Sequence, residues 1–390
     1  SDFQFDSTKN VTEHINSLWS VLSKDFEGND SGSLIPLPNS HMVQGGNSRE
    51  VYYWDSYFIM LGLQAAGNTD LIEKMLDNFA YLTDKTGFIP GSNRTYYLGR
   101  SQPPFFACMV ELLAEIKGEE VYKKYLPTMT KEYEFWMEGI EKLSRENRFH
   151  RRLVRLADGT ILNRYWDDFD GPRPEAYRED VKIAKESGRP AAEVYRDIRA
   201  ACESGWNFSS RWLADGRNMT SIRTTQIIPV DLNCLLYNLE MTLSKAEDLR
   251  GDSEKSEFYK QRADQRKEAV LGWLYHGPAG FFMDFDIPNG EPTYIPSLAG
   301  VFPLFFKMAP ERYALPVAQN IEEDFVRPGG LITTVHHTKQ PWDAPNGWAP
   351  LHWITIQALR NYGHDDLANR IKMNWINLNR KVYHDTGKLV

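Results

Sequence analysis

The feature that most restricts the fold of this sequence is a recurrent helical period, interrupted by loops rich in glycine, proline, asparagine and aromatic residues. From Leu71 to Leu82, apolar residues recur at the spacing of one helix face, and Gly87 can end that helix. Asp70 and Glu73 can form a capping box at its start. The sequence therefore predicts an all-α fold whose loops carry the function.

A second helix is expected to begin at Pro350, because proline is favoured in the first helical turn, and to end near Gly363. The alternation typical of strands is limited to 151–164 and 280–286, which we interpret as hairpins or extended loops. Further helical windows lie near 11–23, 104–116, 129–142, 230–249, 254–274 and 367–382.

No low-complexity linker divides the 390 residues, so we expect a single helical domain over 1–390 with functional loops at one end. Residues 1–33 are expected to form an N-terminal helix and arm. Residues 171–198 are the most polar region, and we interpret them as an excursion that carries one helix. Periodicity alone leaves toroids, bundles and solenoids open, although the irregular units disfavour a repeat array.

Composition excludes several classes of function. A net charge of −8 disfavours nucleic acid as a partner, and no apolar run approaches the length of a membrane span. Cys108, Cys202 and Cys234 have apolar neighbours and no metal-binding spacing, so we expect buried free thiols and no metal. Neither a methionine nor an apolar targeting segment stands at Ser1, so we expect a processed or trimmed protein.

Aromatic residues make up 13% of the sequence and gather in loops beside helices. Residues 205–212 surround Asn207 with two indoles, a phenyl ring and an arginine. Indole faces suit the C–H faces of pyranose rings, and hydroxyl and guanidinium groups suit sugar hydroxyls. A sugar hydrolase would need a carboxylic acid at the centre of this cluster, where the chain has an amide. The alternative is that the large rings fill a large core.

Four further clusters have the same character. Residues 49–57 place Trp54 and Asp55 among tyrosines, or else start a helix with a capped aspartate. Residues 93–104 combine guanidiniums, amides and hydroxyls that suit a polyol, or else form a solvated loop. Residues 164–175 and 342–350 hold charged and indole side chains in proline-rich backbone. Core packing alone does not explain four tryptophan-centred loops that each adjoin a helix.

In order and approximate spacing, six segments of the chain resemble motifs of the trehalases, the glycoside hydrolases that split α,α-trehalose. They are 51–57, 93–104, 172–175, 205–212, 223–233 and 342–350. The resemblance covers the chain from about residue 5 onward. It implies an (α/α)6 toroid and an inverting hydrolysis of trehalose to two glucose molecules without a cofactor, by a general acid and a general base.

Carried over residue by residue, the resemblance places the general acid at Asn207. It implies sugar contacts from Trp54, Asp55, Asn93, Arg100, Ser101, Gln102, Arg173, Glu175, Gly205 and Trp342. Further candidates are Asn47, Tyr53, Trp206 and Trp348. We expect trehalose or glucose as the partner, a monomer, and a periplasmic or secreted location, with a cytoplasmic one as the alternative.

The chain departs from the family pattern at four places. Asn207 cannot release a proton, and loss of a general acid typically costs about 10²–10⁴-fold in rate. Residues 44–48 read Gln-Gly-Gly-Asn-Ser where the family has Pro-Gly-Gly-Arg-Phe. Pro341 stands where a glutamine normally precedes Trp-Asp, and Phe169 where bacterial relatives usually carry arginine.

The family's general base lies in a glycine-rich segment that these 390 residues do not contain. We therefore expect a toroid without its last C-terminal elements and with exposed apolar helix faces. Three interpretations remain open: an inactivated or trimmed trehalase, a natural pseudoenzyme, or a hydrolase that recruits other carboxylates, namely Asp55, Asp167, Glu175 or Asp343. The competing functions are a trehalose- or glucoside-binding protein without turnover, and a helical protein with no ligand.

Overall fold

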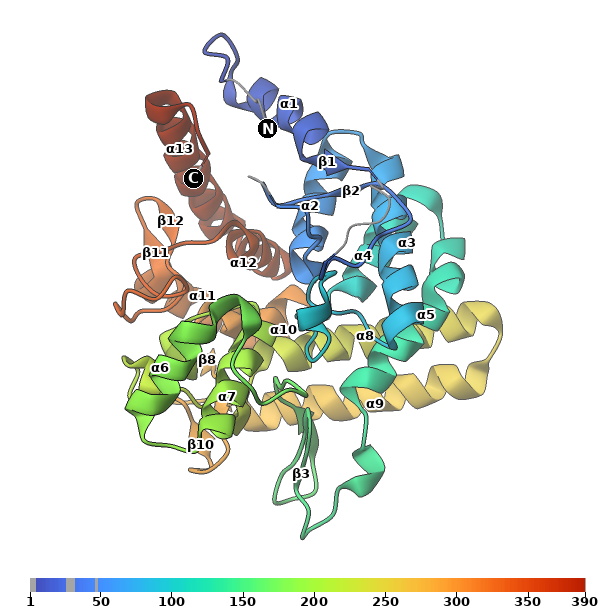
Figure 1. Ribbon diagram of the computed structural model, residues 1–390, viewed down its shortest axis with the longest axis vertical. Helices are drawn as coiled ribbons and strands as arrows, with labels where there is room; N and C mark the ends of the chain where they lie inside the picture. The colour runs from blue at the N-terminus through green and yellow to red at the C-terminus, as the bar shows by residue number, and fades with distance from the viewer. Residues whose placement is uncertain (1–4, 26–31, 46–47, 390) are drawn as a thin grey trace.

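Helices joined by irregular loops dominate the computed structural model, which describes residues 5–25, 32–45 and 48–389 (Figure 1). The all-α class predicted from the helical period is confirmed. The α-helices are α1 (Val11–Leu22), α2 (Tyr53–Ala65), α3 (Thr69–Thr86), α4 (Phe106–Lys117), α5 (Glu120–Trp136), α6 (Tyr177–Ser187), α7 (Ala191–Glu203), α8 (Val230–Arg250), α9 (Ser253–Trp273), α10 (Phe302–Phe305), α11 (Ala314–Asn320), α12 (Ala349–Asn361) and α13 (Asp365–Thr386).

The strands are short and form small antiparallel sheets of two or three strands at the periphery. The two segments expected to be extended each contain strands. The strands are β1 (Ser23–Lys24), β2 (His41–Met42), β3 (Phe149–His150), β4 (Leu153–Arg155), β5 (Ile161–Asn163), β6 (Ile227–Ile228), β7 (Tyr275–His276), β8 (Phe281–Phe282), β9 (Phe285–Asp286), β10 (Glu291–Pro292), β11 (Val326–Arg327) and β12 (Gly330–Leu331).

Most predicted helices lie where the period placed them, with three corrections. α3 ends at Gly87, as predicted, and Gly87 adopts the left-handed conformation. The predicted capping box does not form. The helix begins earlier, so Asp70 lies inside the first turn and Glu73 pairs with lysines of the neighbouring helices instead. The window 129–142 is displaced, because α5 ends at Trp136 and the left-handed Gly139 interrupts the chain.

The third correction concerns the polar region 171–198, which forms two helices where one was expected. α6 ends at Gly188, which adopts the left-handed conformation, and Pro190 stands at the N-cap position of α7. Glycine with positive φ followed by proline prevents one continuous helix. The two helices lie together beside the loops at one end of the molecule (Figure 1).

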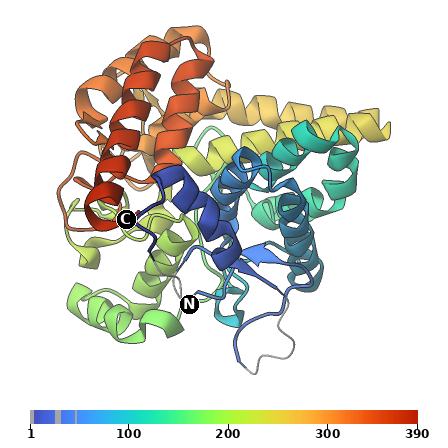
Figure 2. The same ribbon diagram turned by 90° about the horizontal axis from the view of Figure 1, so that it is seen from above.

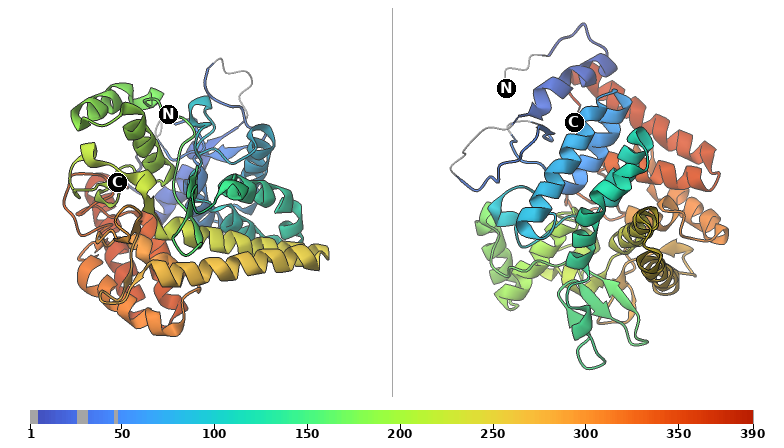
Figure 3. Two further views of the ribbon diagram at one scale, coloured as in Figure 1. Left: turned by 90° about the horizontal axis from the view of Figure 1, so that it is seen from below. Right: turned by 90° about the vertical axis from the view of Figure 1, so that its right-hand side faces the viewer.

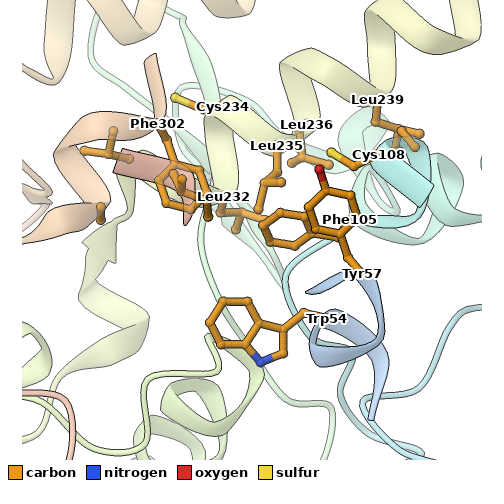
Figure 4. Close-up of a cluster of buried hydrophobic side chains, with 14 of the residues drawn as sticks. Trp54, Tyr57, Phe105, Cys108, Leu232, Cys234, Leu235, Leu236, Leu239 and Phe302 are labelled. Carbon is orange, nitrogen blue, oxygen red and sulfur yellow. The ribbon is translucent and has the colours of Figure 1, made fainter. Parts of the chain in front are cut away.

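α8 and α9 form a long antiparallel hairpin that extends from the body of the molecule (Figure 2, Figure 3). Near the other end of this hairpin, α8 contributes four leucines to the core, namely Leu232, Leu235, Leu236 and Leu239. Figure 4 shows Tyr57 and Phe105 between Trp54 and these leucines, and the two rings stack with centroids 5.2 Å apart. Trp54 is only 3% exposed, so the core reaches up to the candidate site.

α13 lies against the N-terminal segment, where the Tyr383 hydroxyl donates to the carbonyl of Lys9 at 3.0 Å. Apolar side chains on α12 and α13 are exposed, among them Trp353, Met373 and Leu378. The three cysteines are buried free thiols, as predicted. In the part of the chain that the structure describes, we find no helix with both the length and the apolar character of a membrane span.

Candidate active site

A cavity of about 820 Å³ opens among the loops at the N-terminal ends of α2 and α12 and the C-terminal end of α7. Its walls come from segments far apart in the sequence. The lining residues are Gln44, Tyr52, Trp54, Asp55, Phe58, Ile59, Tyr97, Arg100, Gln102, Arg173, Glu175, Cys202, Gly205, Asn207, Pro341, Trp342, Trp348 and Pro350.

Most residues predicted from the sequence are brought together here. The ones that line the cavity are Trp54, Asp55, Arg100, Gln102, Arg173, Glu175, Gly205, Asn207, Trp342 and Trp348. Four of the five clusters that carry them lie in loops between helices, and the fifth is the first turn of α2. The fold thus gathers indoles, guanidiniums, carboxyls and amides around one ligand-sized space.

Two of the predicted sugar contacts, Asn93 and Ser101, do not line the cavity. The Asn93 amide accepts from the Val51 N–H at 2.9 Å and donates to the carbonyl of Ile35 at 2.9 Å. The Ser101 hydroxyl donates to the carbonyl of Ile89 at 2.6 Å. Both side chains bind the backbone of neighbouring loops, so they hold the loops in place.

Among the further candidates, Tyr53 and Trp206 also lie behind the lining. The Tyr53 hydroxyl is buried in the core, where it donates to Glu132 and accepts from the Phe106 N–H at 2.8 Å. Trp206 stacks on Trp342 with centroids 5.3 Å apart. Asn47 falls outside the residues that the structure describes.

Sequence reasoning missed several lining residues. Tyr52 and Tyr97 belong to two of the clusters, and their hydroxyl-bearing rings were a signal that the prediction left unused. Cys202 gave no such signal, because its apolar neighbours indicated a core thiol. The remaining missed residues are Gln44, Phe58, Ile59, Pro341 and Pro350.

Stacked indoles form one wall. Trp342 lies parallel to Trp348, with centroids 4.3 Å apart and planes at 3°, and it is tilted against Trp54 at 5.7 Å. The Trp348 Nε1 donates to the carbonyl of Pro341 at 2.9 Å, which fixes the outermost ring. Such a rigid aromatic wall suits the apolar face of a sugar ring.

His352 supports this wall from α12. Its Nδ1 lies 2.8 Å from the carbonyl of Trp348, and its Nε2 accepts from the Leu331 N–H at 2.8 Å. The two contacts select the neutral tautomer with the proton on Nδ1. Burial lowers the pKa of His352 to about 4, so the imidazole stays neutral and keeps both contacts at neutral pH.

Asp343 joins the loop of Asn207 to the loop of Trp342. Its carboxylate, 0% exposed, accepts from the Ser209 hydroxyl at 2.9 Å, from the Ser210 N–H and hydroxyl at 2.7 Å each, and from two threonine hydroxyls. The Trp342 N–H also donates to the carbonyl of Phe208 at 3.1 Å. Position 207 and the indole wall are therefore held by one buried anion.

Neither Asp343 nor Asp167 faces the cavity, so the structure does not support their recruitment as catalytic carboxylates. Asp167 is 0% exposed and pairs with Arg100 at 3.2 Å and Arg199 at 3.4 Å. Asp55 and Glu175 do line the cavity. Glu175 accepts from Arg100 at 2.6 Å, which couples a cavity carboxylate to a buried guanidinium.

Glu203 anchors the backbone behind Arg100. Fully buried, it accepts from the N–H of Ser101 at 2.8 Å, from the N–H of Trp166 at 3.1 Å and from the guanidinium of Arg152 at 2.7 Å. Burial raises the pKa of Glu203, and Arg152 opposes that rise. The last residue of α7 thus fixes two loops of the site.

Asp55 is the cavity carboxyl with the most perturbed acidity. Burial raises the pKa of Asp55 to about 6, and hydrogen bonds, including one from the Gln44 amide, oppose the rise. A carboxyl with such a pKa exchanges its proton between about pH 5 and 7. Its ability to accept hydrogen bonds from a ligand is therefore controlled by pH in that range.

Gly205 allows Trp54 to lie against the chain beside Asn207. Its φ is 75°, and an added Cβ would meet Trp54 Cε2 at 2.7 Å. We expect Gly205→Ala to displace the indole and to weaken saccharide binding by about tenfold or more, since both strain and a clash act at the cavity wall. Calorimetric titration with trehalose and glucose measures this effect.

Gly188→Ala is the matched control for that prediction. Gly188 has a similar φ of 67°, but nothing lies within 4 Å of its added Cβ. It therefore carries the backbone strain without the contact to Trp54. Equal binding by the two variants would contradict the role of Gly205, whereas equal losses of melting temperature are compatible with it.

Solved structures with similar folds identify the architecture. The neutral trehalase Nth1 from Saccharomyces cerevisiae superposes with a TM-score of 0.74 at 22% identity, over 97% of this chain and 74% of that chain. The GH63 mannosylglycerate hydrolase from Thermus thermophilus in complex with glucose gives 0.57 at 18% identity, over 87% and 88%. These likenesses concern the fold alone, and they confirm the (α/α)6 toroid.

The fold therefore places this protein in the class of helical toroids. Its loops enclose a cavity that is lined by indoles, guanidiniums and carboxyls. The family model described as Trehalase matches residues 3–390. The periplasmic trehalase of Pseudomonas aeruginosa is 49% identical over 382 residues, which are 97% of this chain and 70% of that protein. The periplasmic trehalase of Salmonella paratyphi B is 46% identical over 384 residues, or 98% and 67%.

The chain belongs to the trehalase family and is a glycoside hydrolase by family. The resemblance drawn from the six motifs is confirmed. The chain spans 67–70% of the length of these two relatives.

Proposed function

We propose that the cavity binds α,α-trehalose or its product glucose, and that it is the site of an inverting trehalase in which Asn207 occupies the place of the general acid. The observation that carries the proposal is the convergence of the motif residues on one cavity.

Each group of lining residues suits one part of the ligand. Trp54, Trp342 and Trp348 offer apolar surface to the pyranose rings, while Arg100 and Arg173 donate to hydroxyl oxygens. Asp55 and Glu175 supply acceptors for sugar hydroxyls, and Gln102, whose Oε1 accepts from the Trp54 N–H at 3.1 Å, offers its amide N–H groups. These are the contacts that orient a disaccharide so that its glycosidic oxygen meets position 207.

The chemistry at position 207 explains the expected impairment. In inverting hydrolysis an acid protonates the leaving oxygen while a base activates water on the opposite face of the ring. An amide binds the glycosidic oxygen through N–H donation but transfers no proton. We therefore expect this chain to hold its ligand and to turn it over slowly or not at all.

One observation favours a second function, namely a trehalose- or glucoside-binding protein without turnover. At position 207 the cavity is lined by an amide, which cannot act as a general acid, and within the described residues the carboxyls that line the cavity are Asp55 and Glu175. Calorimetry distinguishes the two proposals from a protein with no ligand. Glucose release after restoration of the acid distinguishes the enzyme from the binding protein.

We further propose a monomer in the periplasm, because both relatives named above are periplasmic trehalases. Residues 1–390 are proposed to act as one domain, since the cavity takes lining from residue 44 to residue 350.

The acidity of Asp55 makes ligand binding depend on pH. The pKa of Asp55 is about 6 in the free protein, and its carboxylate accepts a hydrogen bond from a sugar hydroxyl more strongly than the protonated carboxyl does. Affinity is therefore expected to be highest above about pH 7 and to fall toward a lower plateau as Asp55 takes up its proton below about pH 6. Titrations between about pH 4.5 and 8 measure this, provided that circular dichroism shows a folded chain throughout.

Asp55→Asn is the control for that pH dependence. The amide keeps the size of the side chain but does not titrate, so its weaker affinity should stay constant over the same range. A parent affinity that does not change across the pKa of Asp55 would contradict the assignment of this residue.

A further inference from the structure

α6, the first helix of the polar region 171–198, has so far no role in the site, yet it carries a buried acid directed at a cavity residue. Asp180 lies in the first turn of α6 and is 0% exposed. Its carboxylate accepts from the Arg173 backbone N–H at 2.9 Å, from Arg173 Nε at 3.0 Å and from Arg173 Nη2 at 2.7 Å. The acid thus binds both the main chain and one edge of the guanidinium.

The other contacts of Arg173 leave its opposite edge toward the cavity. Its Nη1 lies 3.3 Å from the Sγ of Cys202, which lines the cavity beside it. The ring of Phe208, the residue after Asn207, lies 5.2 Å from the guanidinium carbon. An arginine has five N–H donors in a rigid planar fork, so fixing the Nε edge also fixes where the remaining donors point.

Asp180 is the acid on which this orientation depends. Within the described residues, the salt bridge that Arg173 makes is the one to Asp180. Glu175, which also lines the cavity, is engaged by Arg100 at 2.6 Å. A bidentate contact between buried partners is short and directional, whereas an unanchored arginine samples many rotamers.

We propose that Asp180 is a positioning residue of the saccharide site, which orients Arg173 so that its Nη1 edge faces the bound sugar. This inference rests on the proposed function, because it concerns how the same cavity recognises its ligand. It assigns to α6 a part in recognition, so the site extends beyond Arg173 and Glu175 into the helix that follows them.

Asp180→Asn tests the proposal, with Glu179→Gln as the matched control. The substitution removes the charge and one acceptor at nearly constant size. We expect Asp180→Asn to weaken trehalose and glucose binding by about 10- to 100-fold, the scale of a small misplacement in a site. Glu179 is exposed next to Asp180 on the same helix, so its variant should bind like the parent chain.

A double-substitution cycle separates positioning from a general loss of stability. Because Asp180 acts through Arg173, Asp180→Asn should change affinity by less than about twofold in a chain that already carries Arg173→Gln. A merely structural role would give the same loss in both backgrounds and would overturn the proposal. Asp180→Glu keeps the charge and the fold, and we expect it to lose less affinity than Asp180→Asn.

Two further outcomes have distinct meanings. If Asp180→Asn and Asp180→Glu bind trehalose and glucose as tightly as the parent chain, the role of Asp180 is overturned while the proposed function stands. If the folded parent chain binds neither sugar, the proposed function fails, and the inference fails with it. Melting temperatures of every variant establish that each titration is made on folded protein.

Discussion

Asn207→Asp is expected to raise the rate of trehalose hydrolysis by about 10²–10⁴-fold in a chain that also has a general base. Asn207 lines the same cavity as the Arg100 and Arg173 guanidiniums and the Trp342 indole. An aspartate there replaces an amide that cannot transfer a proton by an acid that can. Glucose release from trehalose measures the gain.

Two forms of the chain make this test decisive. One is the 390 residues as they stand, and the other carries at its C-terminus the glycine-rich segment of a trehalase. We expect the gain in the second form, and Asn207→Ala should stay inert in both. If Asn207→Asp in the second form is folded, binds trehalose and remains inert, position 207 is not the place of a general acid.

Arg211→Met is expected to lower the free energy of unfolding by about 3–5 kcal/mol, the cost of leaving buried charges without their partner. Arg211 is 0% exposed and donates to Asp284 at 2.6 Å and to Asp231 at 2.7 Å. Its guanidinium carbon also lies 4.3 Å from the ring of Trp212. Methionine keeps the volume and removes the charge that compensates both carboxylates.

Urea unfolding of Arg211→Met and of Arg217→Met provides the comparison. Arg217 is exposed in the same loop region, so its variant should stay within about 0.5 kcal/mol of the parent. Equal stability of the two variants would contradict the view that the charge cluster holds the loop of Asn207 in place. Trehalose affinity of the folded Arg211→Met chain should fall as well, because that loop forms a wall of the cavity.

Much of the site could be predicted from motif order, because the loops between helices carry it. Trp54, Arg173 and Trp342 lie on the cavity as the motifs indicated. The adjacent Tyr53 does not, because neighbours on a helix are turned by about 100°. Tyr53 therefore points into the core, toward Glu132, although Tyr53 and Trp54 belong to the same cluster.

The supporting layer behind the cavity could not be predicted, because it depends on contacts between distant segments. Asp343 meets Ser209 and Ser210 across more than a hundred residues of sequence. Glu203 reaches the backbone of Ser101 in the same way. No local period marks these acids, and only the fold shows that each serves a loop of the site.

The helix boundaries show the same limit of prediction from local sequence. The apolar stripe of α3 and its terminal Gly87 were sufficient to predict where that helix ends. The start was misplaced, because the lysines of neighbouring helices pair with Glu73 and the capping box does not form. Tertiary ion pairs of this kind cannot be seen in the local sequence.

Whether the cavity is a saccharide site is decided by a calorimetric titration of the unsubstituted chain with trehalose, repeated with Trp342→Ala and Arg100→Ala. We expect saturable binding at one site, with a loss of about tenfold or more in each variant, since both residues line the cavity. Absence of saturable binding of trehalose and glucose by the folded parent chain would contradict the assignment of the cavity.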